Sequence, residues 1–402
     1  MATLSSMHSA GAAILTQLLK WSVPAAGQRS LPCKCGHLAH YRELRSKEIL
    51  AVVGKVQVLR PYYLCSHCHD GQFPVDVELD VKGKDLSPGV RRMLATLGQD
   101  APFAHGPKLM KALAGLEVTT KAVERTAEEI GEDIAAVEQE QIQLAMKLKL
   151  QPAKGEPIPI MYLMMDGTGA PVRKSETVGR PSKTPGRQAR TREVKLGCVF
   201  TQTTYNSEGY AIRDPGSTTY AAAIETSAEF GPRMYLESWN RGWSRAQTKI
   251  IIGDGAGWIW NLADQYFPGA ILIVDLYHAR EHLWDLARKL YPNQEPEQKR
   301  WIMIHQYLLD HGKPKKLVTA LEAIALSSPL LARDFHKEAD FFRKNAKRMR
   351  YPKFRRLHLF VGSGVVEAGC RTIVGARCKQ PGMFWTVRGV NAILALRCCQ
   401  LN

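Results

Sequence analysis

Four acidic residues are the side chains of this 402-residue chain whose types and spacing could do chemistry. Asp166, Asp254 and Asp275 each follow a short apolar run, and Glu367 stands far downstream. An apolar run that stops at an acid is typical of a buried strand that delivers a carboxylate to a sheet edge. Several carboxylates at one edge gather negative charge that a hard divalent cation offsets. The pattern therefore predicts two-metal phosphodiester chemistry.

Two Mg²⁺ ions (or Mn²⁺) are the cofactor that these acids predict. Asp166, Asp254 and Glu367 would hold two ions about 4 Å apart, one activating water or a 3′-hydroxyl and the other stabilising the leaving oxygen. Neutral histidine is a poor ligand for a hard cation, so we expect His278 to orient substrate or to hydrogen-bond to Asp275.

The same region has a purely structural interpretation. A single aspartate at a strand end is often a helix cap, and Asp254 could cap a helix that begins at Ala256. Trp258 and Trp260 follow directly, and we interpret them as core anchors of that helix, with DNA contact as the alternative. Several acids on an alternating β/α background favour the catalytic interpretation.

Two cysteine pairs predict a structural zinc site. Cys33 and Cys35 precede a stretch of alternating apolar residues, and Cys65 and Cys68 follow it, which indicates a β-hairpin with metal at its ends. Four thiolates suffice for tetrahedral Zn²⁺. Because so small a ribbon buries little surface, the metal would supply much of its stability. The nearby histidines, His37, His67 and His69, are alternative ligands, and four unligated cysteines are the remaining alternative. The other five of the nine cysteines are expected to be small core residues.

The composition points to a polyanionic partner and to a reducing compartment. The formal net charge is +17 and the pI is about 9.5, a balance typical of nucleic-acid binding; a basic surface without a partner is the alternative. An odd number of cysteines argues against a disulfide framework.

Residues 9–25 are expected to be a docked N-terminal helix. No segment reaches transmembrane length, so we expect no membrane association. The expected location is cytoplasmic and nucleoid-associated.

Composition and residue pattern divide the chain into three expected domains. Residues 1–80 hold the N-terminal helix and the zinc ribbon, and residues 81–150 are helical. Residues 151–402 form an α/β catalytic domain with a helical insertion at about 291–357. In the helical domain Ser87 is expected to cap a helix that ends at Gly98. A second helix covers residues 108–114, and a long one runs from Thr119 or Thr120 to about Lys149. This resembles a helix-turn-helix, with a packing subdomain as the alternative.

In the catalytic domain strands and helices alternate. Strands are expected to end at Asp166, Asp254 and Asp275, with further strands at 195–203 and 208–213; helices are expected at 218–230, 256–266, 278–290, 361–375 and 387–399, with helical structure throughout 297–345. Residues 173–195 form a basic loop that could close over DNA or lack order.

Residues 337–356 are rich in Lys and Arg, with Phe341, Phe342, Tyr351 and Phe354 interleaved. This composition suits contact with phosphates and some base stacking. The alternative is a solvated helix face whose aromatic side chains lie in the core.

The motifs together resemble bacterial insertion-sequence DDE transposases of the ISKra type, relatives of the Mutator-like group. The matching segments are Asp166-Gly-Thr-Gly, Gly253-Asp-Gly-Ala-Gly-Trp-Ile-Trp-Asn, Asp275-Leu-Tyr-His-Ala-Arg-Glu-His-Leu, Gly362-Ser-Gly-Val-Val-Glu-Ala-Gly-Cys-Arg and Gly375-Ala-Arg-Cys-Lys-Gln-Pro-Gly-Met-Phe-Trp. The resemblance spans most of residues 31–397.

This resemblance implies a ribonuclease H-like core with a helical insertion between the fifth strand and the glutamate-bearing helix. The catalytic triad would be Asp166, Asp254 and Glu367, and Asp275 and His278 match an accessory D-x-x-H motif. The implied reaction is Mg²⁺-dependent cleavage at transposon ends, followed by attack of the 3′-hydroxyl on target DNA. The N-terminal ribbon and helices would help recognise terminal inverted repeats in double-stranded DNA. A homo-oligomer is expected because two ends must be synapsed.

Two other functions stay open. One is an inactive or domesticated DNA-binding descendant, and the other is a ribonuclease H-like nuclease without strand transfer. The family's members continue past the position of Cys398, so a shortened copy is also considered.

Overall fold

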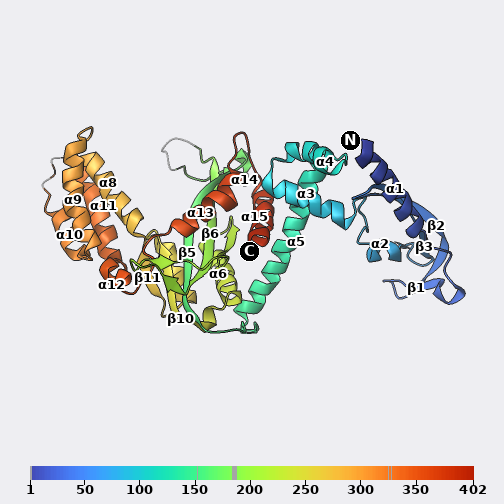
Figure 1. The fold of residues 1–402 in the computed structure, drawn as a ribbon, viewed down its shortest axis with the longest axis horizontal. Coiled ribbons are helices and arrows are strands. Elements are labelled where there is room, and N and C mark those ends of the chain that lie inside the picture. The colour runs from blue at the N-terminus through green and yellow to red at the C-terminus, as the bar shows by residue number, and fades with distance from the viewer. Residues whose placement is uncertain (1, 152, 183–187, 325, 327) are drawn as a thin grey trace. The chain divides into compact units, whose positions relative to one another are not determined.

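The computed structural model describes residues 2–151, 153–182, 188–324, 326 and 328–402. The chain folds as two compact units, Met1–Ile130 and Gly131–Asn402 (Figure 1). The domain boundaries expected at residues 80 and 150 stay predictions. Among the described helices, none is both long and apolar enough to cross a membrane.

The first unit begins with a helix and a β-ribbon. Helix α1 (Ala2–Leu18) packs on the antiparallel sheet β1-β2-β3-β4, and α2 (Pro74–Glu78) follows it. The strands are β1 (Ser30–Pro32), β2 (Leu38–Ala51), β3 (Gly54–Cys65) and β4 (Gly71–Gln72). The expected hairpin is confirmed as β2–β3. The expected docked N-terminal helix is confirmed as α1, but its bounds differ from residues 9–25. It ends at Leu18, and the Trp21 N–H donates to the Leu59 carbonyl of β3.

Three further helices complete the first unit: α3 (Pro88–Asp100), α4 (Gly106–Ala114) and α5 (Thr120–Met146), the last continuing into the second unit. Ser87 caps α3 through the Val90 N–H, and Thr119 caps α5 through the Ala122 N–H, both as predicted. Gly98 does not end α3; it lies inside the helix, where a Cβ would come within 2.5 Å of Ala127. A close helix contact therefore explains this glycine better than a helix end does.

The second unit is built on a five-stranded mixed sheet in the order β11-β10-β5-β6-β9. Its strands are β5 (Ile158–Pro171), β6 (Thr191–Gln202), β9 (Thr219–Ala223), β10 (Ala246–Gly253) and β11 (Ile271–Val274). β5, β6 and β9 pair antiparallel, whereas β5, β10 and β11 pair parallel. The three parallel strands therefore direct their carboxyl ends to one edge.

Helices cover both faces of this sheet. Successive residues of a strand point to opposite faces. Gly197 faces Met234 of α6 (Ser227–Asn240), whereas its neighbour Leu196 faces Gly369 of α13 (Gly364–Gly369). The α7 helix (Gly257–Tyr266) packs on α6, and α15 (Val387–Leu401) packs on β9. Apolar runs such as Ile250–Ile252 are buried as a result.

Three expected elements differ from the structure. Residues 218–230 are not one helix: Thr219–Ala223 pair with β6, and α6 begins only after a capping box formed by Thr226 and Glu229. The first strand does not end at Asp166 but continues to Pro171, because β6 pairs with it throughout. The predicted strand at 208–213 is reduced to β8 (Ala211–Ile212), which pairs with β7 (Thr204–Tyr205).

The expected basic loop is partly regular. Residues 174–177 form a 3₁₀ turn, η3, and β6 begins at Thr191; residues 183–187 lie outside the described part of the chain. Other 3₁₀ turns are Ala26–Gln28 (η1), Phe103–His105 (η2) and Trp243–Arg245 (η4).

Helices fill the segment between β11 and α13. They are α8 (Leu276–Leu290), α9 (Glu295–Asp310), α10 (Pro314–Glu322), α11 (Pro329–Asn345), the 3₁₀ turn η5 (Ala346–Arg348) and α12 (Tyr351–Arg356). We call residues 295–356 the insertion lobe. After α13 the helix widens into a π-helical turn, η6 (Cys370–Gly375), before α14 (Ala376–Cys378).

Candidate functional site

Asp254 lies in the turn that leaves β10 at the carboxyl edge of the sheet. Its Oδ1 accepts a hydrogen bond from the Ala256 N–H at 2.8 Å. Ala256, not Asp254, is the N-cap residue of α7, and it makes no side-chain cap. The capping alternative is therefore wrong for α7, and the second carboxylate oxygen of Asp254 stays available for another ligand.

Asp166 reaches the same edge from the neighbouring strand. The last parallel pair between β5 and β10 is Met164 with Ile252, so Asp166 lies two residues past that pairing while Leu196 still pairs with it on β6. Its own Gly167 N–H donates to Oδ1 at 2.6 Å, and the Cys370 thiol donates to Oδ2 at 3.5 Å.

The charge environment links three of the predicted acids. Burial raises the pKa of Asp166 most, and the negative charges of Asp254 and Glu367 raise it further, against the lowering effect of the Gly167 N–H and the Cys370 thiol. Acids separated by more than two hundred positions in the sequence therefore act on one another in the fold. The pattern of acids after apolar runs predicts such convergence, and the fold adds the groups that surround Asp166.

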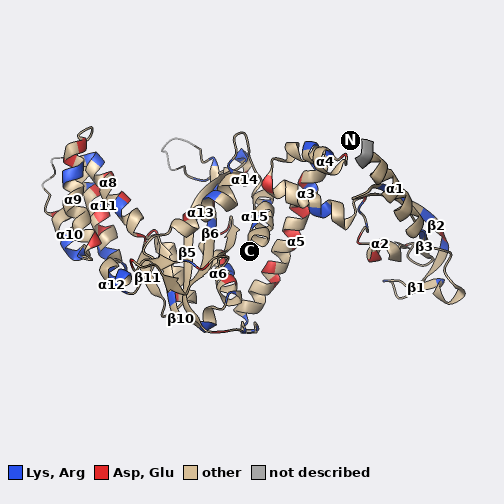
Figure 2. Cartoon of the chain, viewed as in Figure 1, with Lys and Arg blue, Asp and Glu red and all other residues tan. Residues whose placement is uncertain are grey.

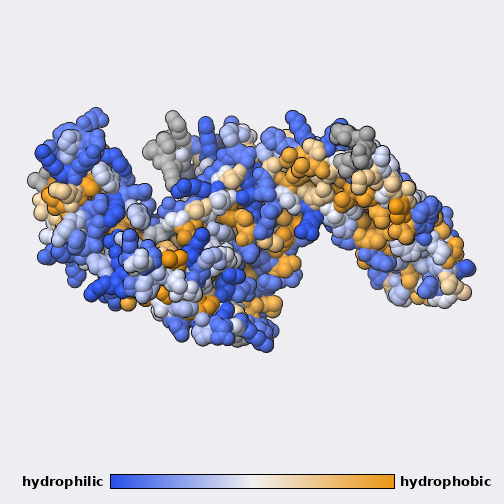
Figure 3. Space-filling model, viewed as in Figure 1, coloured by the Kyte–Doolittle hydropathy of each residue, from blue (hydrophilic) through white to orange (hydrophobic). Residues whose placement is uncertain are grey.

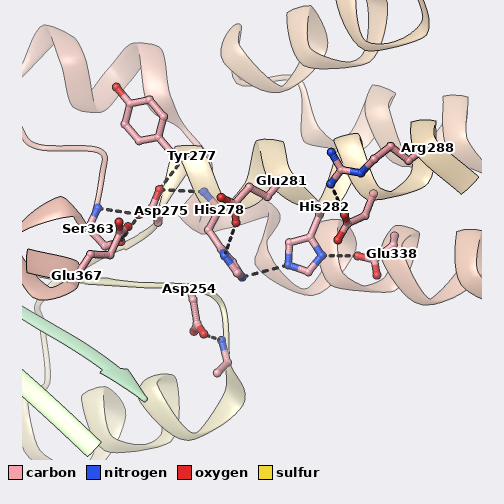
Figure 4. A network of polar contacts seen from close by, with 12 residues as sticks. Asp254, Asp275, Tyr277, His278, Glu281, His282, Arg288, Glu338, Ser363 and Glu367 are labelled. Atoms are coloured by element: carbon pink, nitrogen blue, oxygen red, sulfur yellow. Dashed lines mark hydrogen bonds and ion pairs between the residues drawn. The ribbon is translucent and has the colours of Figure 1, made fainter. Parts of the chain in front are cut away.

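Glu367 is positioned by a serine that sequence reasoning missed. The Ser363 hydroxyl lies 2.9 Å from Glu367 Oε1 and also contacts Asp275 Oδ2 (Figure 4). One hydroxyl proton serves these two carboxylates, so it donates to only one of them at a time. Ser363 stands inside the Gly362-Ser-Gly motif, but its partner Asp275 is distant in the chain, and so its role was not predicted.

Asp275 differs from the other acids because its carboxylate is fully occupied. It is completely buried at the N-terminus of α8. Oδ1 accepts from the N–H groups of Tyr277 and His278, at 2.6 and 3.1 Å, and Oδ2 accepts from the Ser363 N–H at 2.7 Å. A carboxylate satisfied by three amides joins α8 to the segment before α13 and has little capacity left for a metal.

His278 takes part in a histidine network that extends away from the acids. Its ring does not bond to Asp275; only its backbone N–H does. The His278 Nε2 lies 3.3 Å from Nε2 of His282, whose Nδ1 lies 2.6 Å from Glu338 on α11, as Figure 4 shows. Two histidines four residues apart on one helix were detectable in the sequence, whereas Glu338 lies on another helix and was not.

The two tryptophans that follow Asp254 differ in burial and in their contacts. Trp260 is buried, as the core interpretation predicted. Trp258 is half-buried, with the Lys195 ammonium 4.9 Å from its ring centre. The thiol of Cys370, which sequence reasoning also missed, has its pKa raised to about 12 by burial and by Asp166.

The four expected zinc ligands meet in the first unit. The Sγ atoms of Cys33, Cys35, Cys65 and Cys68 all lie within 4.8 Å of one another, with 3.4 Å between Cys33 and Cys68. Zinc–sulfur bonds of about 2.3 Å in a tetrahedron place sulfurs ~3.8 Å apart, close to what is found. The N–H groups of Cys68 and His67 help lower the pKa of Cys65 to about 6. The cluster can therefore hold a metal such as zinc.

Two other expectations concern ligands. Cys35, His37 and His67 form a second possible metal-binding group, which shares Cys35 with the four-cysteine cluster. Two of the three histidines predicted as alternative ligands therefore lie at this site. Among the described residues the carboxylates of the second unit do not form an equally tight group. Of the other five cysteines, Cys198, Cys370, Cys378 and Cys398 are buried as expected, but Cys399 is exposed.

Comparison with known proteins leaves the family open. No protein-family model matches the sequence, and no curated protein matches it. Among solved structures, a chain of the Drosophila P element transposase strand transfer complex is similar with 10% identity and a TM-score of 0.26, covering 78% of each chain. A TM-score of this size lies below the level at which two chains share a fold.

Proposed function

We propose that this chain is a DDE transposase, which cleaves DNA at transposon ends and joins the 3′-hydroxyl ends to target DNA. Asp166, Asp254 and Glu367 would be the catalytic acids. The observation that carries the proposal is that Asp166 and Asp254 leave neighbouring strands at one sheet edge, close enough to Glu367 of α13 for both other carboxylates, together with burial, to raise the pKa of Asp166. Groups with such perturbed pKa values cluster at functional sites.

The three acids fit a pair of Mg²⁺ or Mn²⁺ ions chemically. Carboxylate oxygens are the ligands that such hard cations prefer, and a cation would relieve the mutual repulsion that the acids now experience. Bound ions would act as Lewis acids on the phosphodiester. The chain's own contribution is to hold the carboxylates: Gly167 and Cys370 orient Asp166, Ala256 orients Asp254, and Ser363 orients Glu367.

The architecture of the second unit supports a ribonuclease H-like core. Asp166 lies on β5 two residues past the last β5–β10 pair, and Asp254 directly follows β10. The α13 helix, which carries Glu367, follows the helical insertion in the chain. Asp275 and His278 have supporting roles in this proposal, because the Asp275 carboxylate is occupied by backbone amides.

The test is a cleavage and strand-transfer assay on DNA that flanks the coding sequence, with Mg²⁺ or Mn²⁺ present. Asp254→Asn should reduce both reactions by at least about a thousandfold, because it removes a carboxylate charge at the site of phosphoryl transfer, while DNA binding persists. Asp285→Asn is the matched control, since Asp285 is exposed and, among the described residues, forms an ion pair with Arg288 alone.

Three outcomes separate the candidate functions. Cleavage that persists in Asp254→Asn contradicts the assignment of the acids. Cleavage without joining, even with pre-cleaved ends, identifies a nuclease instead of a transposase. Binding without any reaction in the unmodified chain indicates a non-catalytic DNA-binding protein.

A further inference from the structure

Two adjoining cavities lie next to the acidic edge, between the sheet and the insertion lobe. The first, of about 430 Å³, is lined by residues after Asp254, including Gly255 and Trp260, and by α11. The second, of about 360 Å³, extends to the start of β11. Both are lined by Lys344 and Arg348, so together they form one groove.

The groove is strongly cationic. We call its basic residues the groove cations: Lys337, Lys344, Lys347, Arg348, Arg350 and Lys353. Asp340 is the acid that lines it, and Arg343 already pairs with Asp340. Lys and Arg gather around α12 in Figure 2, and hydrophilic side chains cover most of the visible face of the lobe in Figure 3.

The groove cations are less closely paired with acids than others nearby, although the charge of Asp264 acts on Arg348 at longer range. None of the six forms an ion pair with a residue that the structure describes, whereas on the same group of helices Arg280 pairs with Asp310 at 2.6 Å and Lys289 with Asp334 at 2.7 Å. Uncompensated charges of one sign along a groove concentrate ligands of the opposite sign. This pattern favours an external polyanion as their partner.

The spacing of the groove cations fits a phosphate backbone. Lys337 and Lys344 are two helical turns apart on α11, about 10 Å along one face. Phosphates of one DNA strand recur about every 3.4 Å of helix axis, so this spacing spans about three of them. Arg348 is oriented by the Trp260 ring, 4.6 Å away, and by Asn345 Oδ1 at 3.1 Å. A guanidinium oriented in this way can bind phosphate through paired N–H groups.

The groove and the proposed catalytic site share a packing contact. Gly255 directly follows Asp254 and has φ +101°, and a Cβ on it would collide with Phe341 of α11. The turn that carries Asp254 therefore rests on the helix that carries Lys337 and Lys344. A backbone in the first cavity would therefore lie beside the turn that carries Asp254.

Aromatic stacking does not contribute to this surface. Phe342, Tyr351 and Phe354 are buried, so the core alternative for the aromatics of residues 337–356 is right for these three. Phe341 stacks on His282, with 4.1 Å between ring centres. The rings that line the groove already pack on other groups, Trp260 against Arg348 and Phe341 against His282. Charge with rings engaged in this way favours duplex DNA over single strands, whose binding relies on stacked bases.

We propose that the groove cations bind the phosphate backbone of duplex DNA and guide it to the edge that carries Asp254, without reading its sequence. The choice of DNA as the polyanion rests on the proposed function. The groove itself is an inference from unpaired charge, spacing and position.

The test measures binding of a labelled duplex of arbitrary sequence by fluorescence anisotropy over a range of salt concentrations, without Mg²⁺. Lys344→Gln/Lys347→Gln should lower the slope of log affinity against log salt by about 1.8, and should weaken binding on the order of 10- to 60-fold near 0.1 M salt. The matched control is Lys315→Gln/Lys316→Gln, which removes the same charge from exposed positions on α10 outside the groove. Unchanged melting of both variants verifies folding.

Each result decides the inference. A groove variant that binds as the control does overturns it, and so does a control that weakens binding equally. A loss confined to a single-stranded probe overturns the choice of duplex DNA. Asp254→Asn, measured in parallel, should keep the full salt slope. If Asp254→Asn abolishes cleavage while the groove variant binds normally, only the groove inference fails; if Asp254→Asn still cleaves while the groove variant loses binding, only the catalytic assignment fails.

Discussion

At the residue scale, hydrogen bonding separates two kinds of carboxylate. Asp275 is buried and receives three backbone N–H groups, as expected of a structural acid. Asp166 and Asp254 each receive one backbone N–H and stand at a shared edge. Because the sequence presents all three alike, as acids after apolar runs, only their partners reveal the difference.

Asp166→Asn is expected to stabilise the protein when no Mg²⁺ is present. The native pKa of Asp166 is raised, so ionisation of Asp166 destabilises the fold at neutral pH. Removing the charge should add about 0.5–2 kcal/mol, as substitutions at strained functional sites often do. This gain should be largest at neutral pH, should shrink as the pH falls through the raised pKa, and should vanish below about 3.9, where the acid becomes protonated in the unfolded state too.

The measurement is thermal melting of both proteins across that pH range, in buffer without added Mg²⁺ or chelator, so that the cysteine cluster is undisturbed. Asp285→Asn serves again as the exposed control and should show no such trend. A destabilising effect of Asp166→Asn at neutral pH would contradict the prediction.

Asp275→Ala is expected to destabilise the second unit by about 2–4 kcal/mol, because it removes a helix cap and leaves buried N–H groups without an acceptor. Asp275→Asn keeps one acceptor oxygen and should cost less. Denaturant titration measures both variants. Equal losses for the two substitutions would show that the N–H groups find other acceptors.

At the scale of elements, strand pairing decides where the acids lie. β5 continues past Asp166 because β6 pairs with it to Pro171, while β10 on the other side has already ended. The carboxylate therefore leaves the sheet at a step between a long strand and a short one. The π-helical turn after α13 brings Cys370 to the same carboxylate.

The cysteine ribbon yields a prediction for metal removal. The purified protein should contain one zinc ion per chain, and a strong chelator should unfold β1–β4, because a ribbon of this size depends on its metal. Cys35→Ser should lose the metal, whereas the exposed Cys399→Ser should retain it. Atomic spectroscopy measures the zinc and circular dichroism the folding. A chelated protein with an unchanged spectrum and melting temperature would contradict the prediction.

At the scale of the whole molecule, each compact unit has its own core and its own chemistry. The first unit holds the cysteine cluster, and its helical part packs around Val90, Leu94, Met110, Leu116 and Val123. The second holds the acids, the histidine network and the cationic groove. If the proposed functions are right, catalysis and phosphate contact lie together in the second unit.

The sequence by itself determined the features that depend on near neighbours. The cysteine pairs, the caps at Ser87 and Thr119, and the acids after β10 and β11 follow from residue types within a few positions. These were predicted because local hydrogen bonding and strand pattern are encoded locally.

Tertiary structure decided everything that requires distant partners. Residues Thr219–Ala223 were predicted to be helical, but they form a strand because they pair with the edge of β6. Ser363 and Glu338 acquired their roles only when the fold brought them to Asp275 and His282. The physical reason is that a side chain's partners, burial and electrostatic field are set by segments far away in the chain, which no local pattern contains.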